Sequence, residues 1–180
     1  ELPPKTENLH RIELDEQQRK LYLAAVVDAR EKLRAAKPED KMAVFAVLMR
    51  LREICCDPRL VADNWDGGSA KLDACMELVT AAVEGGHRIL LFSQFTSMLE
   101  LLAKRLDEAG VSHFTLQGST PKPVRAELVR RFNNGEADVF LISLRAGGTG
   151  LNLTAADIVI HYDPWWNVAA QNQATDRAYR

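Results

Sequence analysis

The chain has 180 residues, of which 47% are hydrophobic and 27% are charged, as in a globular protein with one domain or one domain and an appendage. Its formal net charge is −2, and acidic residues slightly outnumber basic ones on either side of residue 70, which excludes a strongly basic nucleic-acid-binding module. No apolar run approaches the about 20 residues of a membrane helix, and the first residues lack a signal-peptide core, so we expect a cytoplasmic or nuclear protein that is not secreted.

The first 69 residues are predicted to form an extended lead-in followed by two helices. Two prolines keep the lead-in out of a helix, and the first helix is expected to begin near Asp15, with Gln18 as its capping-box partner. Residues 15–18 (Asp-Glu-Gln-Gln) imitate the magnesium-binding box of an ATPase, but no apolar strand precedes them, so we interpret them as a helix cap. The second helix follows Pro38 and ends at Pro58.

Apolar side chains at helical spacing predict the buried faces of both helices. In the first helix they are Leu21, Tyr22, Ala25, Val26 and Ala29, and in the second they are Met42, Phe45, Val47, Leu48, Leu51 and Ile54. The three cysteines, Cys55, Cys56 and Cys75, lack the spacing of a zinc site and are interpreted as reduced, structural thiols. A loop rich in turn-forming residues, 62–69, marks a boundary.

From residue 70 onward, short apolar runs alternate with helices. The predicted helices are 71–83, 96–109, 121–132 and a last one from about residue 167, and the predicted strands are 88–92, 113–116, 138–142 and 157–161. Near-continuous apolar strands joined by helices are typical of a parallel sheet covered on both faces. The predicted fold class is therefore α/β, with a helical part at 1–69 and a sheet domain at 70–180.

A glycine-rich loop, residues 143–152, follows the third predicted strand. Gly147, Gly148 and Gly150 remove three side chains, so backbone N–H groups could approach a phosphate closely. A tight turn that needs positive φ explains the glycines equally well. The loop matches neither the Walker A pattern nor G-x-G-x-x-G. A nicotinamide-binding alternative would use Asp163 to hold a ribose, but the glycine spacing disfavours it.

Two further segments follow the last predicted strand. Two tryptophans beside a proline in 163–167 indicate a packed corner, or an aromatic contact with DNA if a phosphate-binding loop lies near. Arg177 and Arg180 share one face of a helix, where two guanidinium groups can grip a polyphosphate, although such a pair alone is usually a solvated basic face. The scattered histidines form no metal motif, and His161 at a strand end is interpreted as structural.

In this order and on these elements, the three segments resemble motifs V and VI of superfamily-two helicase-like ATPases of the Swi/Snf type. Residues 91–98 resemble motif IV of that family, and residues 116–120 with Arg125 resemble its motif IVa. Residues 51–60 resemble the segment before the core of its second lobe. The resemblance covers nearly the whole chain and implies a RecA-like C-terminal lobe, with residues 15–60 as its helical insertion.

The resemblance also implies which residues act. The arginine fingers that reach ATP correspond to Arg177 and Arg180. The implied ATP-binding residues are Gly150 and Asn152, which match positions that approach the nucleotide, and Gln173, which would orient the arginine motif. The positions that contact the DNA backbone are Gly118, Ser119, Ser143, Arg145 and Trp166.

Partners and cofactors follow from the same resemblance. Members of this family bind double-stranded DNA, and ATP with Mg²⁺, between two RecA-like lobes, and the phosphate loop and magnesium ligands of the first lobe are not in this sequence. We therefore expect a piece of a longer DNA-translocating ATPase that is inactive without its first lobe. The alternative is a stand-alone nucleic-acid-binding module without catalysis, which tight DNA binding by the isolated chain at physiological salt would favour.

Overall fold

The structure is a computed structural model that describes residues 4–148, 150–164, 171–172 and 175–176. Its contacts divide the chain into two compact units, residues 9–74 and residues 1–8 with 75–180. The division between residues 1–69 and 70–180 remains a prediction, and it falls at the start of helix α3 (Ala70–Glu84). Among the helices that the structure describes, none is long and apolar enough to cross a membrane.

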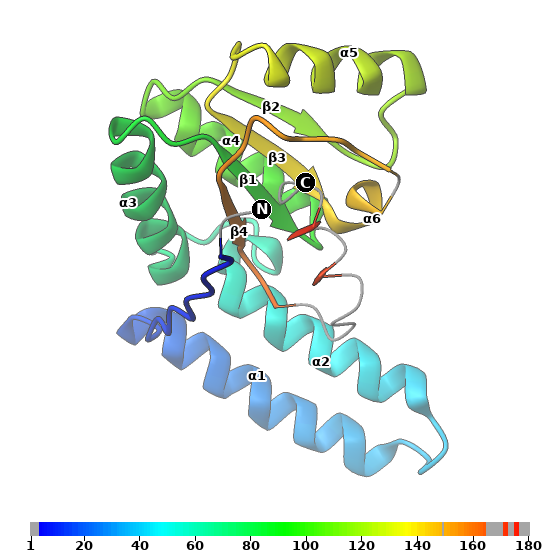
Figure 1. The fold of residues 1–180 in the computed structure, drawn as a ribbon. Coiled ribbons are helices and arrows are strands. Elements are labelled where there is room, and N and C mark those ends of the chain that lie inside the picture. The colour runs from blue at the N-terminus through cyan, green and yellow to red at the C-terminus, as the bar shows by residue number, and fades with distance from the viewer. Residues whose placement is uncertain (1–3, 149, 165–170, 173–174, 177–180) are drawn as a thin grey trace. The chain divides into compact units, whose positions relative to one another are not determined.

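Two long helices make up most of the unit of residues 9–74 (Figure 1). Helix α1 spans Glu16–Ala35 and helix α2 spans Lys41–Cys56, followed by the short 3-10 helix η1 at Pro58–Leu60. Asp15 caps α1 by accepting a hydrogen bond from the backbone N–H of Gln18 at 2.8 Å. Both predicted helices, and the interpretation of residues 15–18 as a cap, are confirmed.

The capping box predicted for Gln18 is wrong, because its side chain turns inward instead of back to Asp15. Gln18 is fully buried. Its Nε2 donates to the carbonyl of Ile54 at 2.9 Å, and its Oε1 accepts from the N–H of Ala70 at 3.2 Å. The side-chain amide of Gln18 thus provides the hydrogen-bond partners of a carbonyl in the last turn of α2 and of the N–H of the first residue of α3. Leaving such buried groups unpaired costs roughly 1–3 kcal/mol each, so Gln18 fixes α1 against the end of α2 and against residue 70.

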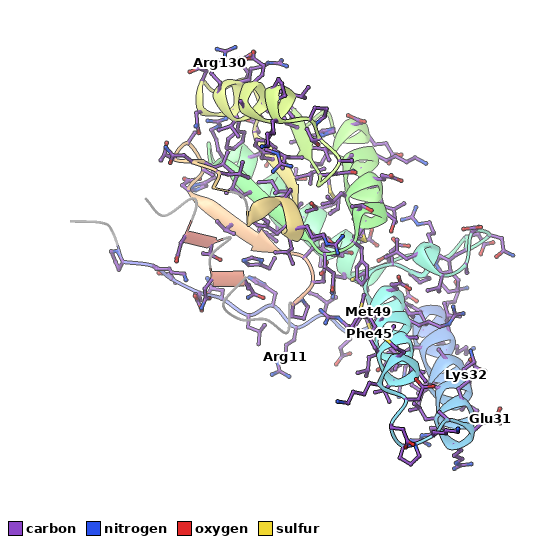
Figure 2. The ribbon with its side chains drawn as sticks, turned by 90° about the vertical axis from the view of Figure 1, so that its right-hand side faces the viewer. Arg11, Glu31, Lys32, Phe45, Met49 and Arg130 are labelled. Atoms are coloured by element: carbon purple, nitrogen blue, oxygen red, sulfur yellow. The ribbon has the colours of Figure 1, made fainter. Side chains whose placement is uncertain are left out.

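Part of the apolar face predicted for α2 is exposed. Met42, Phe45 and Leu48 are 75%, 46% and 46% exposed, whereas Ile54 is fully buried. Figure 2 shows Phe45 on α2 beside Met49, one helical turn further on. The groove between the two helices is lined by four alanines, Ala25, Ala29, Ala43 and Ala46, together with Val47 and Leu51 of the predicted face and the longer side chains of Asp28, Lys32 and Arg50. Helical spacing identifies an apolar stripe, but it does not say how much of the stripe a neighbouring helix covers.

A four-stranded parallel sheet forms the centre of the unit that contains residues 75–180. Its strands are β1 (Ile89–Ser93), β2 (His113–Leu116), β3 (Val139–Ser143) and β4 (Ile158–His161), arranged in the order β2-β3-β1-β4 (Figure 1). Every residue of β1 and β3 is buried, as expected for a parallel sheet covered on both faces. The predicted α/β, RecA-like fold is confirmed, with β1 and β3 shifted by one residue, so that Ser143 belongs to the strand.

The helices that connect the strands lie on opposite faces of the sheet. Helix α4 (Thr96–Glu108) joins β1 to β2, and helix α5 (Lys122–Asn133) leads from β2 back to β3. Because these crossovers run in opposite directions and both are right-handed, their helices cover different faces. On the α5 face, Phe132 packs edge-on against Phe140 with ring centroids 5.2 Å apart. Because all four strands are parallel, they end at the same edge of the sheet, between the helix layers that cover its two faces.

Candidate functional site

The loops that leave the four strands meet at the carboxyl edge of the sheet. In open α/β sheets this edge is where ligands bind, because the strands are parallel and every strand-to-helix loop emerges there. It carries the turn after β2, the glycine-rich segment after β3 and the corner after β4. Six of the ten predicted site residues lie at the end of β3 or on the first two of these loops: Gly118, Ser119, Ser143, Arg145, Gly150 and Asn152.

The turn after β2 presents Gly118 and Ser119 at an exposed tip. Its base is closed by two hydrogen bonds, from the N–H of Thr120 to the carbonyl of Gln117 at 3.1 Å and from the N–H of Gln117 to Thr120 Oγ1 at 3.0 Å. The guanidinium of Arg125, from α5, also donates to the Gln117 carbonyl at 3.4 Å. These hydrogen bonds fix the base of the turn. The Ser119 hydroxyl and the backbone of Gly118 and Ser119 remain exposed at its tip, as contact with a phosphate requires.

The segment after β3 begins with a short helix rather than an open loop. Helix α6 spans Leu144–Gly147, and the hydroxyl of Ser143 caps it by accepting from the N–H of Ala146 at 3.3 Å. Ser143 is buried, so the role that the structure shows for its side chain is this cap, and its DNA contact remains a prediction. Arg145, which α6 carries, is exposed.

Only one of the three loop glycines in this segment needs a glycine conformation. Gly147 is buried within α6, and Gly148 has a φ of −73° that any residue can adopt. Gly150 has a φ of 74°, where an L side chain is strained. It is exposed, and a Cβ built there would meet nothing within 4 Å among the described residues. The positive-φ explanation therefore holds for Gly150, and the backbone at this position is open to a ligand.

Asn133, which the sequence did not single out, holds the segment that follows Gly150. Its Nδ2 donates to the carbonyl of Asn152 at 2.9 Å, and its Oδ1 accepts from the N–H of Ala155 at 3.4 Å. Leu151 and Leu153 on either side of Asn152 are buried, whereas Asn152 is exposed. The alternation turns the Asn152 side chain outward, and the Asn133 amide fixes its backbone.

The corner after β4 is built around a buried carboxylate. Asp163 is 1% exposed and accepts hydrogen bonds from the hydroxyl of Ser93 at 2.5 Å and the N–H of Gln94 at 3.1 Å. The Ser93 hydroxyl in turn accepts from the N–H of Phe95 at 3.1 Å. Asp163 therefore joins the ends of β1 and β4, and a carboxylate so enclosed is not placed to hold a ribose, as the nicotinamide alternative requires.

Four of the predicted site residues lie outside the described residues. They are Trp166, Gln173, Arg177 and Arg180. Among the described residues, Thr175 lies two positions from both Gln173 and Arg177, and its hydroxyl lies 2.9 Å from Nε2 of His161 at the end of β4. This contact places Thr175 at the same sheet edge as the glycine segment.

The cysteines take no part in this edge. Cys56 and Cys75 are buried, and burial raises the pKa of the Cys55 thiol above its usual value. Across the described ranges, no group of three histidine, cysteine, aspartate or glutamate side chains is placed to bind a metal ion. The interpretation of the cysteines as structural thiols agrees with this burial.

Comparison with known protein families gives two matches along the chain. Residues 70–180 match the helicase conserved C-terminal domain, and residues 1–60 match the SNF2-related domain. Among curated proteins, a putative ATP-dependent helicase/translocase of Bacillus subtilis is 39% identical over 99% of this chain and 20% of that protein. The mouse SWI/SNF-related matrix-associated actin-dependent regulator of chromatin subfamily A member 1 is 35% identical over 99% of this chain and 18% of its own length. The chain thus spans about a fifth of these relatives.

Solved structures with this fold agree with the sequence matches. The Sulfolobus solfataricus SWI2/SNF2 ATPase C-terminal domain superposes with a TM-score of 0.78 and 29% identity, covering 88% of this chain and 72% of that one. The SWI2/SNF2 ATPase core of the same organism in complex with dsDNA has a TM-score of 0.81 and 28% identity, covering 94% of this chain and 36% of that one.

Proposed function

Since the chain belongs to the Swi/Snf-type superfamily-two helicases as their C-terminal RecA-like lobe, we propose that it is one half of an ATP-driven motor that moves on double-stranded DNA. The observation that carries the proposal is the convergence of the turn after β2, the glycine segment and the corner after β4 on one sheet edge. The other half of the motor is a first RecA-like lobe of the same protein, and the two lobes close on ATP.

The nucleotide half of the proposal rests on the segment around Gly150. Gly150 leaves its backbone open and Asn152 is exposed, which fits close approach of a nucleotide to this edge. Arg177 and Arg180 donate to the phosphates and stabilise the charge that develops on them, while Gln173 orients the two arginines. The phosphoryl group that ATP supplies, and the Mg²⁺ that accompanies it, are held mainly by the first lobe.

The DNA half of the proposal rests on exposed groups of the same edge. Gly118 and Ser119 present a backbone and a hydroxyl, and Arg145 on α6 adds a positive charge. Ser143 and Trp166 complete the predicted contact, Ser143 by holding the helix that carries Arg145. With a net charge of −2, grip on DNA comes from this local patch and weakens steeply with salt.

ATP hydrolysis by the full-length protein, with and without duplex DNA, tests the proposal. Arg177→Ala and Arg180→Ala are expected to lower kcat by about a thousandfold or more, as for other arginine fingers. Arg145→Ala is expected to raise the DNA concentration needed for stimulation. Arg130→Ala is the matched control, since Arg130 is an exposed arginine of α5 paired with Glu127 (Figure 2). Full activity in both Arg177→Ala and Arg180→Ala would refute the arginine-finger roles.

The 180-residue chain alone separates this proposal from the stand-alone binding module. As a single lobe working in the cytoplasm or nucleus, it is expected to show no ATPase activity and weak, salt-sensitive DNA binding. Tight binding of duplex DNA at physiological salt, together with a full-length protein that does not hydrolyse ATP, would favour the binding module. Sustained hydrolysis by the isolated chain would contradict the division of labour between lobes.

A further inference from the structure

His161, at the end of β4, is held in one plane by packing. Its imidazole stacks on the ring of Phe92 in β1, with ring centroids 5.4 Å apart and an angle of 20° between the ring planes. Phe92 is almost fully buried, so the ring beneath the imidazole cannot move aside. The directions in which the two ring nitrogens point are therefore set by the sheet.

The hydrogen bonds around Thr175 determine which ring nitrogen carries the proton. Thr175 Oγ1 donates its only proton to the carbonyl of Gln171, one turn earlier, at 3.1 Å. The same oxygen lies 2.9 Å from His161 Nε2, so it accepts there and Nε2 is the donor. The imidazole thus points an N–H at the segment of residues 171–176, whose described residues are helical.

The environment of His161 keeps the ring neutral, and among the described residues its other nitrogen has no hydrogen-bond partner. Burial, reinforced by the charge of Lys5 and opposed by that of Glu7, lowers the pKa of His161 to about 4. Nδ1 is buried and has no hydrogen-bond partner in the part of the chain that the structure describes. An unpaired buried nitrogen is unfavourable, whereas a phenyl ring would fill the same stack without it. What the imidazole adds to this stack, compared with a phenyl ring, is the Nε2–H.

Thr175 lies two residues from Gln173 and two from Arg177. A contact that holds Thr175 at the end of β4 therefore acts on the same short stretch of chain as the proposed arginine fingers. Resting on the proposed function, we propose that His161 is a positioning residue for the arginine pair. Its Nε2–H holds the Thr175 hydroxyl and so restricts movement of Thr175, two residues before Arg177, relative to the end of β4.

DNA-stimulated ATP hydrolysis by the full-length protein tests this role. His161→Phe keeps the stack on Phe92 but removes the N–H, and Thr175→Val keeps the shape of threonine but removes the hydroxyl. Each is expected to lower kcat about 10- to 100-fold with little change in KM for ATP, since misplacement of a catalytic group by 1 Å costs about this much. Thr175→Ser should restore kcat, and Thr154→Val, at an exposed threonine, is the control.

The two substitutions remove the same contact, so their effects are expected not to multiply in the double variant. Any of three outcomes would overturn the role of His161. The losses of kcat in the two single variants could multiply in the double variant, Thr175→Ser could fail to restore kcat, or folded His161→Phe could keep the wild-type kcat. If His161→Phe reduces the yield of folded protein, Thr175→Val and Thr175→Ser carry the comparison alone. Arg177→Ala in parallel tells the two proposals apart: loss of activity there with full activity in His161→Phe removes only the positioning role.

Discussion

Asn133 offers a direct test of how the glycine segment is held. Asn133→Leu keeps the approximate volume of the side chain but removes its hydrogen bonds to the Asn152 carbonyl, at 2.9 Å, and from the Ala155 N–H, at 3.4 Å. The shorter bond is exposed and the longer one is poorly formed, so together they contribute about 1.5 kcal/mol, at the low end for two bonds. Because 1.4 kcal/mol corresponds to a factor of ten, local opening of residues 152–155 should become about tenfold more frequent.

Amide hydrogen exchange of the full-length protein measures this opening. In Asn133→Leu the Ala155 amide, which loses its acceptor, is expected to exchange about tenfold faster, while amides of β3 keep their protection because its residues are buried. Asn134→Leu is the matched control, since Asn134 is the exposed neighbour at the end of α5. Unchanged exchange at Ala155 in Asn133→Leu would show that the buried Leu151 and Leu153 hold the segment without the amide.

Three further predictions concern stability, each measured as a shift in the unfolding midpoint. Gln18→Leu leaves one buried carbonyl and one N–H unpaired and is expected to cost about 2–4 kcal/mol, whereas a loss below 0.5 kcal/mol (about the effect of a surface substitution) would contradict its role. Gly150→Ala should cost about 1–2 kcal/mol because its φ is 74°, while Gly118→Ala, with no positive φ, should cost nothing comparable. The lowered pKa of His161, about 4 against 6.5, means that the unfolded chain binds the extra proton between these pH values. Stability relative to His161→Phe should therefore fall from pH 7 to pH 5, by about 1–2 kcal/mol after allowance for partial exposure, and parallel pH profiles would refute this.

The parts of the fold that sequence reasoning predicted are those encoded locally. Apolar runs identified all four strands to within a residue, and their alternation with helices indicated a parallel sheet. The order of the loops after residues 116, 142 and 161 then indicated the carboxyl edge as the site. Each of these inferences needs only the pattern of residues within one element and the geometry of a parallel sheet.

The contacts that sequence reasoning missed connect residues far apart in the chain. Nothing near Asn133 indicates that its amide meets Asn152, and nothing near Ser93 indicates that its hydroxyl meets Asp163. Gln18 shows how a local motif is overridden: in a capping box its Oε1 would accept from the N–H of Asp15, but this oxygen accepts from the N–H of Ala70 instead, while Nε2 donates to the carbonyl of Ile54. Such pairings are decided by which polar groups burial would otherwise leave unsatisfied, and that is known only once the elements are packed.

The strand order has a consequence for synthesis of the protein. β1 is synthesised before the other strands but lies between β3 and β4. Ile89 therefore cannot pair until Val139, on one side, and Ile158, on the other, have been synthesised. At about 5–20 residues per second on the ribosome, both edges of this strand, which is fully buried in the folded protein, stay unpaired for seconds. A nascent chain that stalls before residue 158 would keep one of them open, and an unpaired apolar edge is what chaperones bind and aggregates grow from.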